Sequence, residues 1–134
     1  MTKGYDAHQQ RQMVLSSFGK DLARRAKSKC ELSGASGVPL HIYEVPPTPQ
    51  EPDADRCLML CEDVLDQLNK PSLIAPDQWH HLNELIWSEI TPVQIMAYRI
   101  LTHIAKQESW AQDILDEAYL DEEIVASANK SALN

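Results

Sequence analysis

Residues 92–107, PVQIMAYRILTHIAKQ, carry the strongest periodic pattern in the sequence. Apolar side chains recur there at intervals of three and four residues, which places them along one face of an α-helix. Thr91 and Pro92 are suited to begin such a helix, as its cap and its first residue. The pattern predicts a buried helix with this inward stripe: Val93, Met96, Ala97, Ile100, Leu101 and Ile104.

Shorter helical patterns lie on both sides of this segment. Residues 62–70 predict a short helix that stops before a proline, and residues 76–89 predict another with Pro76 as its first residue. Farther along, a helix is expected to start near Ser109, with residues 121–130 extending or following it. The C-terminal half of the chain is therefore predicted to be helical.

The first segment also predicts a helix, from about Asp6 as its N-cap to Ser28, because apolar residues recur there at intervals of four. These residues are Val14, Phe18, Leu22 and Ala26. The other faces of this helix are basic, and the candidate binding residues are Lys20, Arg24, Arg25, Lys27 and Lys29. Two interpretations stay open: a solvated helix that pairs with the acidic remainder of the chain, or a patch for an anion or a nucleic acid.

Between these helical regions, residues 38–45 alternate in polarity and are rich in β-branched and aromatic side chains, which predicts a strand. Residues 56–61, RCLMLC, predict a second strand. The loop between them is rich in proline and acidic residues, so it is unsuited to the centre of a sheet. We expect an α+β, mainly helical fold, in which a small antiparallel hairpin packs with four to five α-helices.

The composition indicates a single domain over residues 1–134. The chain is 43% hydrophobic, enough to bury a core without covalent cross-links. It divides into a basic N-terminal helix (1–29), the hairpin (30–64) and a helical part (65–129). No apolar run resembles a signal peptide or reaches the length of a membrane span, and three cysteines are too few for a disulfide framework. These features predict a cytoplasmic protein without a membrane partner.

The net charge of −8 is unevenly distributed. Residues 1–30 hold seven Lys and Arg against two acidic residues, whereas the rest of the chain holds five against eighteen. Sequence-independent nucleic-acid binding depends on many contacts from basic side chains to phosphates, which disfavours it for the molecule as a whole. The two oppositely charged parts are instead expected to attract each other at close range.

Two short stretches each resemble half of a zinc knuckle, in which Cys-x-x-Cys supplies two ligands. Cys30 is followed by Ser33, and Cys61 by Val64, at the positions where the second thiols would stand. Cys57 does not complete the set, because it shares a strand face with Cys61 but lies four extended residues away. This vestigial frame predicts that the protein holds no metal or other cofactor. An irregular zinc site that recruits further ligands stays open, and the candidates are His41, Asp63 and His80.

Several longer stretches resemble the PhnA-like family, named after an alkylphosphonate-utilisation operon. They are KSKCELSG, IYEVPP, RCLMLCED, QWHHLNELIWSEITPVQIMAYRIL and WAQDILDEAYLDEE, in that order, and the likeness covers about residues 24–125. The resemblance implies the N-terminal half of a longer protein, with complete knuckles that form a zinc ribbon and a small β-rich domain that follows. This chain departs from the family at Ser33 and Val64, and it ends where the later domain would start. The resemblance therefore implies a degenerate zinc-ribbon-like fold and no particular chemistry.

The best candidates for catalysis are His80 and Glu84, which lie four residues apart in the predicted helix 76–89. A general base with a carboxylate that orients it has this form, but so do ordinary surface ion pairs. The three tryptophans, Trp79, Trp87 and Trp110, are expected in the core or at its edge. A solvated acidic face is expected from Asp113, Asp116, Glu117, Asp121, Glu122 and Glu123.

Three functional hypotheses follow. The favoured one is a PhnA-like, non-catalytic and metal-free interaction module for a protein partner. The second is a nucleic-acid-associated module that uses the basic N-terminal helix. The third is a hydrolase linked to phosphonate metabolism, and it rests on the family name alone, so an enzymatic role is disfavoured.

Overall fold

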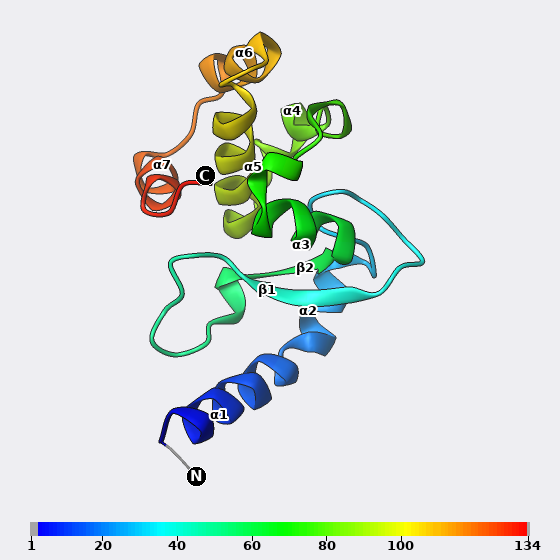
Figure 1. Ribbon diagram of the computed structural model, residues 1–134, viewed down its shortest axis with the longest axis vertical. Coiled ribbons are helices and arrows are strands. Elements are labelled where there is room, and N and C mark those ends of the chain that lie inside the picture. Colours follow the sequence, from blue (N-terminus) through cyan, green and yellow to red (C-terminus); the bar gives the residue numbers. More distant parts are fainter. Residues whose placement is uncertain (1–2, 134) are drawn as a thin grey trace.

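The computed structural model describes residues 3–133 and confirms an α+β, mainly helical fold (Figure 1). The strands are β1 (Leu40–Glu44) and β2 (Cys57–Cys61). The helices are α1 (Lys3–Ser17), α2 (Gly19–Ala26), α3 (Glu62–Asn69), α4 (Leu82–Leu85), α5 (Thr91–Ile104), α6 (Ser109–Glu117) and α7 (Glu122–Asn129). The described residues thus form more helices than the four to five expected, because the N-terminal helix is divided and α7 is separate from α6.

The N-terminal helical segment is broken at Phe18, where the sequence predicted one continuous helix. α1 also begins before Asp6, so Asp6 is not its N-cap. The break lets Leu15 of α1 and Leu22 of α2 both reach the hairpin, where they share an apolar cluster. Val14, which was expected to face inward, is 42% exposed instead. Packing against the hairpin, rather than helical periodicity alone, decides which face is buried.

The strands pair antiparallel in a register that places Ile42 opposite Met59. Helices cover both faces of the hairpin, with α1 and α2 on one side and α3–α7 on the other (Figure 1). Side chains alternate between the two faces of a strand, so Leu58 and Leu60 enter the helical core, whereas Cys57 and Met59 face α1 and α2. All five residues of β2 are buried, which makes β2 the central element of the fold.

The larger core is organised around α5, on which α4, α6 and α7 pack. The predicted inward stripe is confirmed, since all six of its residues are buried. Arg99 is also buried in α5, and its guanidinium donates to the carbonyl oxygens of Ser127 and Ala128 at the end of α7, both at 3.0 Å. Burial lowers the pKa of Arg99, and these carbonyls offset part of the free energy needed to bury its charge.

Residues 76–89 do not form the single predicted helix, because a 3₁₀ segment and a turn precede the short α4. In this segment the Trp79 indole donates to Gln67 Oε1 at 2.9 Å. The His81 ring contacts the carbonyl oxygen of Leu32 at 2.6 Å. These tertiary contacts outweigh the local helical pattern.

Candidate functional site

The two half-knuckles meet at one end of the hairpin. Ser33 Oγ lies 3.7 Å from Cys61 Sγ, and the Ser33 amide donates to Cys30 Sγ at 3.4 Å. Gly34 forms the turn after Ser33 with a φ of +78°, a conformation that glycine adopts at low energy. Val64 in α3 belongs to the same apolar cluster as both cysteines. The structure therefore brings together three positions of the vestigial frame and buries the fourth, Val64, in the core.

Hydrogen-bond donors surround the Cys30 sulfur. Burial opposes ionisation of this thiol, but the Ser33 hydroxyl and the backbone N–H groups of Cys61, Ser33 and Leu32 outweigh it. The pKa of Cys30 is lowered as a result, since each donor stabilises the thiolate. The N–H and O–H groups of the polypeptide thus direct their positive ends at the Cys30 sulfur, where a zinc knuckle would place a cation.

The residues present do not fit a tetrahedral zinc ion, which needs four ligands. Val64 has no donor atom, and within residues 3–133 no three His, Cys, Asp or Glu side chains gather in an arrangement that could hold a metal. The additional ligands considered from the sequence interact elsewhere. His41 pairs with Glu62 at 3.5 Å, Asp63 accepts from Gln67 at 3.3 Å, and His80 lies 4.0 Å from Asp77.

Cys57 and Cys61 do not share a face, contrary to the sequence prediction. Cys61 ends β2 and, as the N-cap residue of α3, packs into the helical core, whereas Cys57 faces the N-terminal helices. The Cys57 thiol donates to the Asp53 carbonyl oxygen at 3.3 Å. Burial, together with the carboxylates of Glu44 and Asp53, raises the pKa of Cys57 to about 11. The environments of Cys30 and Cys57 therefore shift their pKa values in opposite directions.

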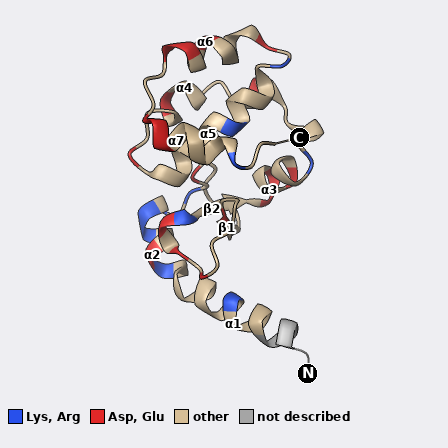
Figure 2. Ribbon diagram, turned by 90° about the vertical axis from the view of Figure 1, so that its left-hand side faces the viewer, with Lys and Arg blue, Asp and Glu red and all other residues tan. Residues whose placement is uncertain are grey.

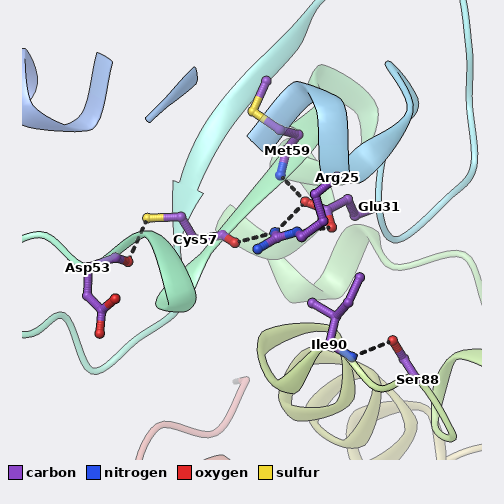
Figure 3. A network of polar contacts seen from close by, with 7 residues as sticks. All are labelled: Arg25, Glu31, Asp53, Cys57, Met59, Ser88 and Ile90. Carbon is purple, nitrogen blue, oxygen red and sulfur yellow. Dashed lines mark hydrogen bonds and ion pairs between the residues drawn. The ribbon is translucent and has the colours of Figure 1, made fainter. Parts of the chain in front are cut away.

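Arg25, one of the five candidate binding residues, is used inside the fold (Figure 3). Its guanidinium donates to Glu31 in two hydrogen bonds of 3.1 and 2.7 Å, and to the Cys57 carbonyl oxygen at 2.7 Å. Glu31 also accepts from the Met59 amide at 2.9 Å, and the Glu31 amide donates to the Met59 carbonyl oxygen. Since the Glu31 side chain is only 4% exposed, this network is structural. The sequence offered no signal for Glu31, because a single acidic residue beside Cys30 belongs to no periodic pattern.

The other four candidate binding residues are exposed, and we name them the basic face of α2: Lys20, Arg24, Lys27 and Lys29. They lie on α2 and on the turn that follows it (Figure 2). Arg24 is 3.7 Å from Asp21, with both side chains largely exposed, and the three lysines form no ion pair within residues 3–133. The acidic residues of α6 and α7, which are exposed as predicted, lie on the far side of the hairpin (Figure 2).

Arg11 joins α1 to the hairpin. Its Nε donates to Glu44 Oε2 at 3.0 Å, and its terminal nitrogens donate to the carbonyl oxygens of Pro49 and Gln50 at 2.9 Å. The hydrogen bond to Glu44 raises the pKa of Arg11. Within residues 3–133, the expected attraction between the basic segment and the acidic remainder is thus realised at the hairpin, through Arg11 and Arg25.

His80 and Glu84 are not joined by a hydrogen bond or ion pair in the described part of the chain. His80 precedes α4, and its ring packs against Trp110 with centroids 4.1 Å apart. Glu84 is exposed in α4. Of the tryptophans expected in the core or at its edge, Trp79 is buried, Trp110 is half-buried and Trp87 is 53% exposed. The geometry that the sequence suggested for a general base is therefore not formed.

Comparisons with known proteins gave no match. No family model, no curated protein and no solved structure is significantly similar to this chain. The resemblance to PhnA-like proteins stays a prediction. None of the helices within residues 3–133 combines the length and the apolar character that crossing a membrane requires.

Proposed function

We propose that this protein is a non-catalytic, metal-free interaction module, and that the basic face of α2 binds an acidic protein partner. The observation that carries the proposal is the exposure of four basic side chains on one short segment, away from the acidic helices. Closely spaced cations create a local positive potential even in a chain of net charge −8. Such a potential favours partners that carry carboxylates at matching positions.

The fold holds this face in a defined position. Leu22 on the inner side of α2 is buried against the hairpin, and Arg25 ties the same helix to Glu31 and to β2. The backbone that carries the exposed cations is therefore ordered before a partner arrives, which reduces the entropy lost on binding.

An acidic protein surface fits this face better than a nucleic acid does. Affinity for nucleic acids sums many phosphate contacts, and four cations supply few of them. The net charge of −8 also repels a long polyanion, whereas a protein partner needs negative charge only at the contact. Nucleic-acid binding by the same residues is the outcome that would replace this proposal.

The non-catalytic and metal-free parts of the proposal have their own support. His80, the best candidate for a base, lies near Asp77 and packs against Trp110, and within residues 3–133 it forms no hydrogen bond or ion pair with Glu84. Ser33 and Val64 leave the knuckle frame two thiols short.

Charge reversal tests the role of the basic face. The variant Lys20→Glu/Lys27→Glu/Lys29→Glu reverses its lysines. The control variant, with the same net charge, reverses three exposed lysines of the helical part: Lys70→Glu, Lys106→Glu and Lys130→Glu. We expect the first variant to bind a short glutamate-rich peptide at least about tenfold more weakly than the control, with a difference that shrinks at high salt. Equal affinities, or tighter binding of duplex DNA than of this peptide by the unaltered protein, would contradict the proposal.

A further inference from the structure

Cys30 and Cys61 lie next to each other, although they are far apart in the sequence. Ser33 contacts both sulfur atoms: its amide donates to Cys30 Sγ at 3.4 Å, and its hydroxyl lies 3.7 Å from Cys61 Sγ. Both thiols are free. The interaction proposed for the basic face of α2 makes no use of this pair.

A surface hollow of about 540 Å³ reaches Cys61 from solvent. Ser33 and Cys61 form part of its wall, together with Ala35, Pro39 and Gln78. Cys61 is 6% exposed, and Cys30, at 2%, contacts Ser33 in the wall of the hollow. A hollow of this size admits molecules as small as water, so an oxidant of similar dimensions can reach the wall that Ser33 and Cys61 form.

We propose that hydrogen peroxide, or another small hydroperoxide, oxidises Cys30 and Cys61 to an intramolecular disulfide. The Cys30 thiolate attacks one peroxide oxygen, the O–O bond breaks and hydroxide leaves, so that Cys30 becomes a sulfenic acid. The Cys61 thiol then attacks the Cys30 sulfur, the S–S bond forms, and the sulfenic oxygen departs as water with the Cys61 proton. The two thiols lose two electrons, and the peroxide, after the hydroxide takes up a solvent proton, is reduced to two waters.

The surroundings of the sulfur atoms indicate which cysteine attacks the peroxide. The Ser33 amide donates to Cys30 Sγ at 3.4 Å, and hydrogen bonding lowers the pKa of this thiol, which favours Cys30 as the attacking thiolate. Cys57 provides an internal contrast within the same molecule. It is fully buried in the other cluster, where its thiol donates to the Asp53 carbonyl oxygen. We therefore expect Cys57 to stay reduced.

The test uses the reduced full-length protein and a small excess of hydrogen peroxide at neutral pH. We expect two of the three free thiols and about 2 Da of mass to be lost. Trypsin cleaves after Lys29 and after Arg56, so the digest releases linked peptides that begin at Cys30 and at Cys57. Fragmentation of the linked pair then assigns the second sulfur to Cys61.

Single variants provide the controls. Cys57→Ser is the matched control and is expected to form the same disulfide, whereas Cys61→Ser is expected to lose it. Peptide assignment in the unaltered protein decides the question even if a variant fails to fold. A disulfide that contains Cys57, disulfides that form only between molecules, or retention of all three thiols would overturn the proposal.

Discussion

The two faces of β2 are held by different kinds of interaction. On the side of α3–α7, two leucines of β2 enter a large apolar cluster. On the side of α1 and α2, the buried cluster among the described residues consists of four: Leu15, Leu22, Cys57 and Met59. Two charged pairs supplement this small cluster, Arg25 with Glu31 and Arg11 with Glu44. Where little apolar surface is available, directional polar contacts fix the position of the N-terminal helices.

Neighbouring residues of β2 allow the two faces to be compared directly. Leu58 is fully buried in the large cluster, and Met59 is 8% exposed in the small one. We expect Leu58→Ala to lower the free energy of unfolding by about 4 kcal/mol and Met59→Ala by about 2 kcal/mol, since the larger core has less room to relax around a cavity. Urea denaturation followed by circular dichroism measures both values. Equal losses would show that the two faces contribute alike.

Removal of a buried charge tests the polar side. Glu31→Gln leaves the Arg25 guanidinium without its counter-ion, and we expect it to destabilise the protein by about 3 kcal/mol. The control is Arg24→Gln, at the residue next to Arg25. Because the pair of Arg24 with Asp21 is exposed, we expect the free energy of unfolding of this variant to change by no more than about 0.5 kcal/mol. Thermal unfolding of the three proteins provides the comparison. A Glu31→Gln variant as stable as the control would mean that the network contributes no net stability.

The knuckle frame allows an added metal site to stabilise the side of the hairpin that α3–α7 cover. Ser33→Cys combined with Val64→Cys supplies four thiols, and we expect this variant to bind one zinc ion. Zinc at 100 times its dissociation constant then raises the free energy of unfolding by about 2.7 kcal/mol, because only the folded state offers the complete site. Metal content and the unfolding midpoint are measured with and without a chelator, so the variant serves as its own reference. A folded variant that takes up no zinc would show that the two half-knuckles do not converge.

The smallest expected effect concerns pH and the Cys57 side of the hairpin. The pKa of Cys57 is raised from 9.0 to about 11 in the folded state. Between these values the unfolded chain has lost a proton that the folded chain keeps, so the free energy of unfolding falls as pH rises. We expect a loss of about 1 to 2 kcal/mol over this range. The Cys57→Ala variant should lack this loss. Burial also raises the pKa of Tyr43, but this contribution to the pH dependence is the same in both proteins and cancels when they are compared. Parallel pH profiles for the two proteins would contradict the assignment.

The sequence predicted the parts of the fold that local patterns determine. The stripe of α5 followed from its periodicity, and both strands were placed to within two residues at each end. The break at Phe18 and the interrupted segment 76–89 were not predictable, because buried partners distant in the sequence decide them. Local propensity is weak compared with such packing.

The candidate site shows the same division. The half-knuckle spacing pointed to Cys30, Ser33 and Cys61, since a tight turn is a local property of the chain. Basic composition likewise identified the face of α2. It did not distinguish Arg25 from Arg24, because that distinction depends on Glu31 and on the edge of β2.

The position of Glu31 also bears on self-association. An open strand edge presents N–H and C=O groups that another chain can pair with. On the outer edge of β2, Glu31 engages both groups of Met59, one through its carboxylate and one through its amide. The outer edge of β1 pairs with no other strand in the described residues. A carboxylate therefore blocks edge-to-edge aggregation on the β2 side of the hairpin.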